Sequence, residues 1–284
     1  MKCFRLGRAI GGCFGSLLAL LVSTEACAYP FFAANSSGTL AQFDTTSPGA
    51  AGTSVVISGI GLGESIVGID TRPLDLQLYV LTKDGSNAGR LYRVDATSGA
   101  ATLVASLTAN PGDPFPYTGL VGTRFGISFQ PVVDRLRLVT DAGQNFRINP
   151  STGTVFHDTD LNPGTPHVVA VAYINSFHGA TATTLYDIDS NLDALLIQNP
   201  ANNGTLTMVG SGLGVNMLDL VGFDIAMAGT TNVAYATALV GGNVNLYSID
   251  LASGLASLVG GLNGNFQTVG IAIVQDRIFA NGFE

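Results

Sequence analysis

Outside its first 28 residues the chain has no cysteine and almost no lysine or glutamate. All three cysteines lie within that first segment. If the segment is removed, the mature protein has no disulfide, no thiolate metal site and no cysteine nucleophile. Its stability must then come from burial alone, for which a chain of this length is sufficient. Lys83 is the only lysine left, and Glu64 and Glu284 are the only glutamates.

The first 28 residues have the pattern of a secretory signal peptide. Lys2, Arg5 and Arg8 form a positive region, residues 17–22 are apolar, and Ala26-Cys27-Ala28 offers a cleavage site. This apolar run is too short to be a spanning helix, and no later run approaches the required length. We therefore expect residues 1–28 to be cleaved and the protein to be exported to the periplasm or beyond, with no membrane span.

The sequence has few charged residues, and most of them are acidic. Cleavage moves the formal charge from −8 to −10, with nine Lys and Arg against nineteen Asp and Glu. A chain this acidic has no electrostatic footprint for nucleic acid or for an anionic membrane. We expect neither as a partner.

Enzyme motifs are also missing. The sequence contains no G-x-S-x-G nucleophile elbow, no H-E-x-x-H, no P-loop and no dinucleotide fingerprint. A glycosidase with two catalytic carboxylates would have to use aspartates. The three histidines, His157, His167 and His178, have no standard ligand spacing.

What the chain does have is a repeat. A turn phrase that begins Asp/Asn-x-x-Ser/Thr/Asn and ends in Gly occurs five times, every 50 to 54 residues, and two of the copies have one extra residue before the Gly. Its Asp or Asn positions are Asp44, Asp95, Asn149, Asn199 and Asp250. A period of this size is typical of a propeller or a solenoid. Each copy divides into four short apolar runs separated by turn residues, which predicts antiparallel strands joined by tight turns.

One run of each copy carries a small residue at the same register. These residues are Gly68, Gly126, Ala170, Gly222 and Gly270. The innermost strands of a propeller converge on its axis, where small residues let backbones approach. The first copy, residues 31–58, lacks this run, and the run around residue 270 has no full copy after it. We therefore predict an all-β, five-bladed β-propeller of four-stranded antiparallel blades over residues 29–275, closed by N-terminal and C-terminal strands in one blade. Residues 276–284 are left as a short tail, and we expect a monomer.

Two stretches carry a resemblance to a known family. They are residues 125–150, beginning Phe125-Gly126-Ile127-Ser128-Phe129, and residues 179–189. Both resemble the domain of unknown function 4394, a bacterial family of exported proteins, and the likeness covers roughly residues 35–275. The resemblance implies no activity and no catalytic residues, because the family has none established.

The axial strands supply one candidate site. Asp70, Ser128 and Asp224 lie two residues after the small position and so on the same face of their strands. Close carboxylates repel each other and call for a cation, a proton or an arginine. Arg72 and Arg124, near the ends of neighbouring axial strands, are candidates to supply that charge. The alternative is that each aspartate caps a strand end and faces water.

Calcium is a second, weaker hypothesis, since we otherwise expect no cofactor. Asp187, Asp189, Asn191 and Asp193 place oxygens at alternate positions, as a hard cation requires. The segment fails as an EF-hand, because Leu192 replaces the turn glycine. Asp and Asn also cap turns with their own side chains, and we favour that role here.

Arg135, Arg137 and Arg147 form a third group, which alternates on neighbouring strands. They are candidates for a ladder with Asp134 and Asp141. The alternative, which we favour, is structural ion pairing on a blade face.

Three functions remain open. The leading hypothesis is an exported, non-catalytic propeller that binds a small ligand, a glycan or a protein. The second is a carbohydrate- or lactone-active hydrolase or lyase that uses the axial aspartates, and the third is a structural surface or matrix protein.

Overall fold

The computed structural model describes residues 28–50 and 52–274, and these are built almost entirely from β-strands. Two 3-10 helices, η1 (Ala201–Asn203) and η2 (Asn263–Asn265), interrupt the strands. Within these ranges, no helix has the length and apolar character needed to cross a membrane. Residues 1–27 of the predicted signal peptide and the whole of the predicted tail lie outside the described residues.

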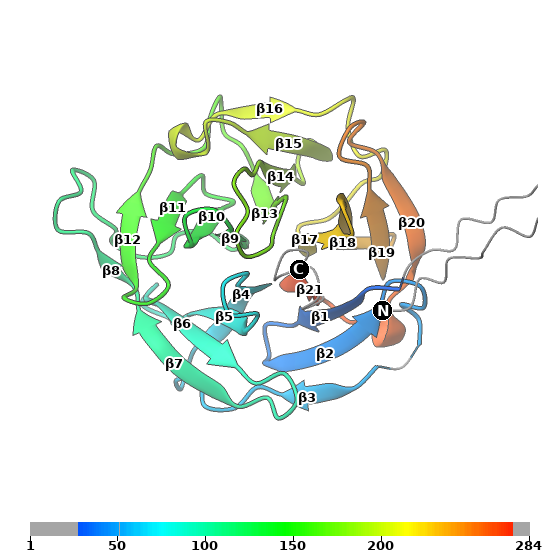
Figure 1. Cartoon of the computed structure of the whole chain (residues 1–284), viewed down its shortest axis with the longest axis horizontal. Coiled ribbons are helices and arrows are strands. Elements are labelled where there is room, and N and C mark those ends of the chain that lie inside the picture. Colours follow the sequence, from blue (N-terminus) through cyan, green and yellow to red (C-terminus); the bar gives the residue numbers. More distant parts are fainter. Residues whose placement is uncertain (1–27, 51, 275–284) are drawn as a thin grey trace, which may run out of the picture.

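The described strands form five sheets around a central axis, so the protein is a five-bladed β-propeller (Figure 1). The innermost strand of each sheet stands at the axis and the outermost strand lies at the rim. The inner strands are β4 (Ser65–Thr71), β9 (Phe125–Gln130), β13 (Val168–Tyr173), β17 (Val221–Ala228) and β21 (Gly270–Ile273). Each of them contains one small residue of the predicted column.

The remaining strands follow each inner strand outward in antiparallel order. Blade 2 continues from β4 through β5 (Leu78–Lys83), β6 (Gly89–Val94) and β7 (Ala101–Ser106). Blade 3 continues from β9 through β10 (Arg135–Thr140), β11 (Asn145–Ile148) and β12 (Thr154–His157). Blade 4 continues from β13 through β14 (Leu185–Asp189), β15 (Ala194–Gln198) and β16 (Leu206–Met208). Blade 5 continues from β17 through β18 (Thr231–Val240), β19 (Asn243–Ile249) and β20 (Ala256–Gly261).

Blade 1 closes the ring with strands from both ends of the described chain, as the repeat predicts. Its order is β21, β1 (Pro30–Ala34), β2 (Thr39–Asp44) and β3 (Ser54–Val56). β1 pairs antiparallel with β21, and the register places Phe31 opposite Ile273 and Ala34 opposite Gly270. This pairing leaves no inner strand of the described ring without a partner.

The repeated turn phrase packs against the backbone of the preceding blade. In blade 2, Asp95 accepts bonds from the backbone N–H groups of Thr97 and Ser98, and Gly99 has a left-handed φ of 75°. A Cβ at Gly99 would lie 2.3 Å from the carbonyl oxygen of Val56 in blade 1. Glycine is therefore required both by its φ and by the approach of the neighbouring blade.

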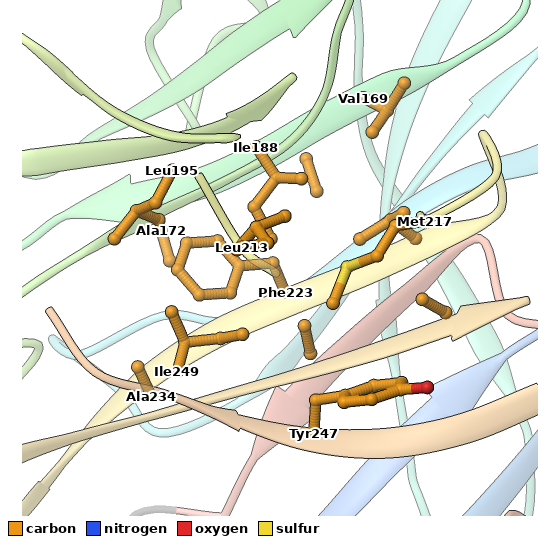
Figure 2. Close-up of a cluster of buried hydrophobic side chains, with 14 of the residues drawn as sticks. Val169, Ala172, Ile188, Leu195, Leu213, Met217, Phe223, Ala234, Tyr247 and Ile249 are labelled. Atoms are coloured by element: carbon orange, nitrogen blue, oxygen red, sulfur yellow. The ribbon is translucent and has the colours of Figure 1, made fainter. Parts of the chain in front are cut away.

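The core is divided among the seams between blades. Within the described chain, five clusters of buried apolar side chains each join residues of two adjacent blades. Figure 2 shows the cluster between blades 4 and 5, in which Phe223, Ile188 and Ile249 pack together. Burial of apolar surface therefore holds blade against blade, and it contributes the main stabilisation of the ring.

One strand of blade 3 was not predicted from the sequence. β8 (Thr108–Ala109) adds a fifth strand at the outer edge of this blade, parallel to β12. Thr108 and Ala109 come from the segment that follows blade 2, so blade 2 and blade 3 share this edge. A strand of two residues is too short to give a periodic pattern in the sequence.

We expect that a chain ending at residue 267 will lose its stable fold, because it lacks β21. Without β21, β1 exposes an unpaired row of backbone groups and an apolar edge. Size-exclusion chromatography and thermal unfolding should show aggregation and a strongly lowered Tm. A chain ending at residue 275 keeps β21 and is the control. A monomeric 1–267 chain with the Tm of that control would contradict closure through β21.

Candidate functional site

The side chains two residues after the small axial residues link neighbouring blades at the axis. Asp70 of β4 accepts the backbone N–H of Phe129 in β9 at 2.6 Å, and Asp224 of β17 accepts that of Ile273 in β21 at 2.6 Å. Ser128 of β9 accepts the N–H of Tyr173 in β13 through its Oγ at 3.2 Å. Each of the three side chains therefore reaches into the following blade.

In blades 4 and 1 the position of Asp70, Ser128 and Asp224 is occupied by Ala172 and Ala272, whose side chains cannot accept a hydrogen bond. The N–H groups of the following blades, 5 and 2, therefore need another acceptor. There, the N–H of Ile225 and the N–H of Thr71 turn to the preceding residue of their own strand, Asp224 and Asp70, at 2.7 Å each. Three side chains thus satisfy all five equivalent backbone donors around the axis. Buried backbone donors rarely remain unpaired, and this register explains how they are paired here.

Both axial carboxyl groups are buried and have altered acidity. Burial, followed by the charge of Asp224, raises the pKa of Asp70 well above its ordinary value. Burial raises the pKa of Asp224 to about 6, against the opposing effect of the backbone donors Ile273 and Ile225. Each carboxylate already uses both oxygens for backbone bonds, which accounts for its place in a buried ring.

The two predicted counter-charges lie elsewhere. Arg72 ends up beyond the last residue of β4, where it pairs with Asp75 and Asp134 and donates to the hydroxyl of Tyr79. Arg124 precedes β9, at the opposite end of the inner strands, and donates to the carbonyl of Thr123. Neither arginine is hydrogen-bonded to Asp70 or Asp224. The structure therefore brings together Asp70, Ser128 and Asp224, but not the two arginines with them.

Arg124 instead stands in a cavity at the mouth of the axis. This channel-mouth cavity has a volume of about 440 Å³ and receives residues from the beginning of all five inner strands. Its apolar side chains include the residue just before the small position in every blade. These are Val67, Phe125, Val169, Val221 and Val269. Below this ring the space between the small residues is only about 10 Å³, so the cavity is a cup with a closed floor.

Close contact of the inner strands closes that floor. A Cβ at Gly126 would lie 2.8 Å from the backbone nitrogen of Val171 in the next blade. Only glycine permits this approach. The axial aspartates lie beyond the floor and are not among the lining residues of the cup.

The rim of the cup is polar and carries both charge signs. Lys83, Arg124, Asp84 and Asp219 line it. The two acids have partners: Asp84 pairs with Arg90 at 3.2 Å, and Asp219 accepts from Ser190 at 2.8 Å. The Nε of Arg124 is buried and has no hydrogen-bond partner in the described part of the chain. A ligand oxygen that reached this nitrogen would satisfy an otherwise unpaired donor.

Arg124 was a predicted site residue, but the cup around it was not predicted. The signal was present, because a large apolar residue precedes the small position in all five copies. What could not be inferred from the sequence is that Lys83, at the end of β5, and Asp219, in the loop before β17, meet at the same rim.

The four residues of the calcium hypothesis are spread over a strand and a turn. Asp187 is buried within β14, and both of its oxygens lack a partner in the described chain. Burial raises its pKa well above the ordinary value, opposed by the charge of Arg137. Asp189 caps the turn by accepting from the N–H groups of Asn191 and Leu192. Asp193 accepts from the N–H of Met217.

Residues 28–50 and 52–274 contain no group of three or more His, Cys, Asp or Glu side chains that could hold a metal ion. Calcium binding at this turn stays a prediction of the sequence.

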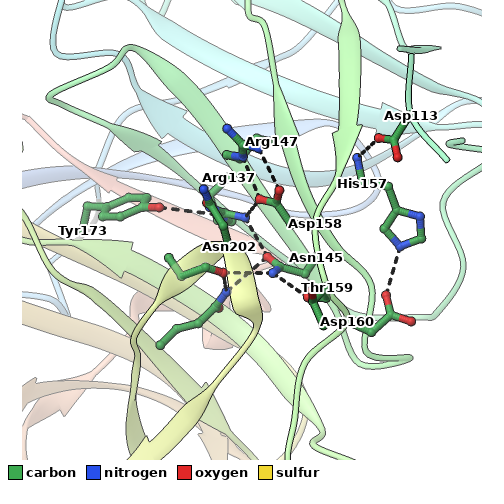
Figure 3. A network of polar contacts seen from close by, with 12 residues as sticks. Asp113, Arg137, Asn145, Arg147, His157, Asp158, Thr159, Asp160, Tyr173 and Asn202 are labelled. Atoms are coloured by element: carbon green, nitrogen blue, oxygen red, sulfur yellow. Dashed lines mark hydrogen bonds and ion pairs between the residues drawn. The ribbon is translucent and has the colours of Figure 1, made fainter. Parts of the chain in front are cut away.

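The arginine group is paired differently from the expectation. Arg147 forms a two-pronged contact with Asp158 through Nε and Nη2, at 2.7 and 2.8 Å, and Arg137 reaches the same carboxylate at 2.8 Å (Figure 3). The expected partners are engaged elsewhere, Asp134 with Arg72 and Asp141 with Thr123. The ladder with Asp134 and Asp141 is therefore wrong, because Asp158 follows β12 and folds back beside both arginines.

The fold and the axial cup define a closed β-propeller whose polar and apolar groups converge at the axis. The sequence profile of the domain of unknown function family DUF4394 matches residues 39–272. The chain belongs to this family, as its resemblance suggested.

Solved structures show distant propellers of varied kinds. A chain of a nidogen/laminin complex is 16% identical, with a TM-score of 0.47, and the match covers 87% of this chain and 98% of that one. The major allergen Mala s 1 of Malassezia sympodialis is 10% identical, with a TM-score of 0.43 and coverage of 74% and 83%. TolB from Acinetobacter baumannii is 12% identical, with a TM-score of 0.42 and coverage of 88% and 67%. No curated protein matches the chain significantly.

We expect Asp70→Ala to destabilise the fold more than Ser128→Ala. The first change strands two buried N–H groups and the second strands one, at about 1–3 kcal/mol per group. Chemical unfolding should show the difference in the free energy of unfolding. Asp95→Ala is the control, because Asp95 also accepts two N–H bonds but in an exposed turn that water can reach. Equal losses for Asp70→Ala and Asp95→Ala would refute the axial role.

We also expect a pH dependence of stability to which Asp224 contributes. Because its native pKa is about 6 and its ordinary value is 3.8, the native state binds a proton at higher pH than the unfolded chain does. The free energy of unfolding should therefore rise as pH falls from about 7 to about 5. Asp224→Asn should make this rise smaller in thermal unfolding curves.

Asp250→Asn is the control for this experiment. Asp250 is exposed, and backbone donors lower its pKa, so its titration lies below that window. The slope should be unchanged in this variant. A slope in Asp224→Asn equal to that of the unaltered chain would contradict the assignment.

Proposed function

We propose that this protein is an exported, non-catalytic propeller that binds a small molecule in the channel-mouth cavity. The observation that carries the proposal is the cup itself, in which all five blades contribute an apolar floor and Arg124 offers an unpaired donor. Its volume of about 440 Å³ falls in the range of small-molecule sites. The ligand that fits has an apolar body and an oxygen acceptor at one end.

Binding is favoured over catalysis by the state of the axial aspartates. A hydrolase at the axis needs carboxyl groups that can reach a substrate. Asp70 and Asp224 spend both oxygens on backbone bonds and lie beyond the closed floor. The acids at the rim, Asp84 and Asp219, are also paired. These contacts support a receptor site.

Export is the second part of the proposal, supported by the signal-peptide pattern of residues 1–28. The protein is proposed to act in the periplasm or outside the cell as a monomer. Ring closure supports the monomer, since it leaves only short outer strands at the described edges.

We expect the fluorescent sulfonate 8-anilino-1-naphthalenesulfonate to bind the cup, since it combines an apolar body with an anionic group. Arg124→Gln should weaken binding about tenfold by removing a charged donor. Val67→Phe should abolish binding by filling the floor. Fluorescence titration measures both.

Arg93→Gln is the matched control, because Arg93 is exposed on β6, away from the cup. Binding should be unchanged in this variant. Binding that survives both Arg124→Gln and Val67→Phe would place the probe elsewhere and refute the channel-mouth site.

A further inference from the structure

A second cavity lies between blades 3 and 4, toward the other end of the inner strands. This seam cavity has a volume of about 420 Å³. Gln130 at the end of β9 and Tyr173 at the end of β13 line it, whereas the channel-mouth cavity is lined by the beginnings of those strands. The two cavities share no lining residue, so the second is a separate site.

The seam cavity concentrates positive charge in an acidic protein. Arg135, Arg137 and Arg147 all line it, and none of its lining residues in the described chain is acidic. The nearest partner carboxylate is Asp158, which both Arg137 and Arg147 contact. Asp187 is also close enough to interact with Arg137, but burial raises its pKa well above the ordinary value, which favours its neutral form. Asp158 against three guanidinium groups therefore leaves an excess of positive charge facing the cavity. Such a site attracts an anion.

Hydrogen bonds hold the three guanidinium groups in place, yet Arg135 and Arg147 keep N–H donors that have no partner in the described chain. Arg137 is only 2% exposed and is fixed by Asn145, Asp158 and Asn202 (Figure 3). Arg147 spends Nε and Nη2 on Asp158, and its Nη1 has no partner in the described residues. Arg135 donates only through Nη1, to the backbone carbonyls of Val133 and Asp134. Its Nε and Nη2 stay available for a two-pronged contact with an oxyanion, the geometry that guanidinium favours.

Gln198 adds a second requirement on the ligand. It is 2% exposed, and its Nε2 donates to Asn145 and to the carbonyl of Ala201. Its Oε1 is buried in the wall of the cavity without any partner in the described chain. A buried acceptor left unpaired is costly, so this atom calls for a donor such as a hydroxyl group. The remaining wall is largely polar, with Thr183, Thr184 and Asn199.

We propose that the seam cavity binds an acidic sugar, with the carboxylate on Arg135 and Arg147 and a ring hydroxyl donating to Gln198. A hexuronic acid combines the required anion with several hydroxyl donors and is small enough for the cavity. Arg137 acts as a positioning residue, because its network fixes Asp158 and Asn202 around the site. This assignment does not depend on the channel-mouth proposal.

The test is isothermal titration of the purified full chain with D-galacturonate and D-glucuronate. D-galactose and D-glucose are the neutral counterparts, and sodium sulfate is an oxyanion without hydroxyl donors for Gln198. At least one uronate should bind saturably. Its neutral counterpart and sulfate should each bind at least about tenfold more weakly, since each lacks one of the two required interactions.

Variants locate the site. Arg135→Gln should weaken uronate binding about tenfold, since it removes the unpaired prongs while breaking only two backbone contacts. Arg147→Gln should do the same, and circular dichroism should confirm that both variants are folded. Arg93→Gln is the matched control, because Arg93 holds the register position of Arg147 one repeat earlier, is exposed and lies outside the cavity. Arg124→Gln should also leave uronate binding unchanged, which separates this site from the channel mouth.

Four results would overturn the proposal. They are no saturable binding of either uronate, equal binding of the neutral sugar, sulfate binding as tight as that of the uronate, and uronate binding that Arg135→Gln leaves unchanged. Sulfate binding as tight as uronate binding would reduce the cavity to a site for a bare oxyanion.

Discussion

The contact between neighbouring inner strands is the constraint on which the rest of the molecule depends. Five backbones meet at the axis only because Gly68, Gly126, Ala170, Gly222 and Gly270 leave room there. That approach removes water from a ring of backbone N–H groups, and Asp70, Ser128 and Asp224 replace it as acceptors. The close packing of the inner strands therefore requires the buried acceptor side chains at the axis. It also closes the floor of the cup above it.

The sequence predicted those features that repeat. The turn phrase and the small column repeat in all five copies, so they defined the blades, the axis and the closure of blade 1 by β21. The shared face of Asp70, Ser128 and Asp224 followed from strand geometry. The hydrogen-bond partners of these three side chains could not be predicted. They lie in the next blade, and which of its groups the side chains reach depends on how adjacent sheets are rotated.

Features that occur once were harder to infer. Asp158 contacts both Arg137 and Arg147, although Asp141 is nearer to both in the sequence. β8 and the two cavities likewise depend on residues from different copies that meet only in the closed ring. Repeats thus predict a scaffold well, whereas candidate sites form where individual copies depart from the repeat.

The closing pair of β1 and β21 also determines the order in which the ring can be completed. β1, β2 and β3 come early in the chain, yet their sheet receives its inner strand only from β21, at the far end of the described residues. Blades 2 to 5 are built mainly from contiguous strands and can form first, as local contacts generally do. The entropy cost of joining two distant segments grows only slowly with the number of residues between them. The long separation of β1 and β21 therefore adds little to the cost of closing the ring. The ring therefore cannot close until β21 has been synthesised, and only then does it become one cooperative unit.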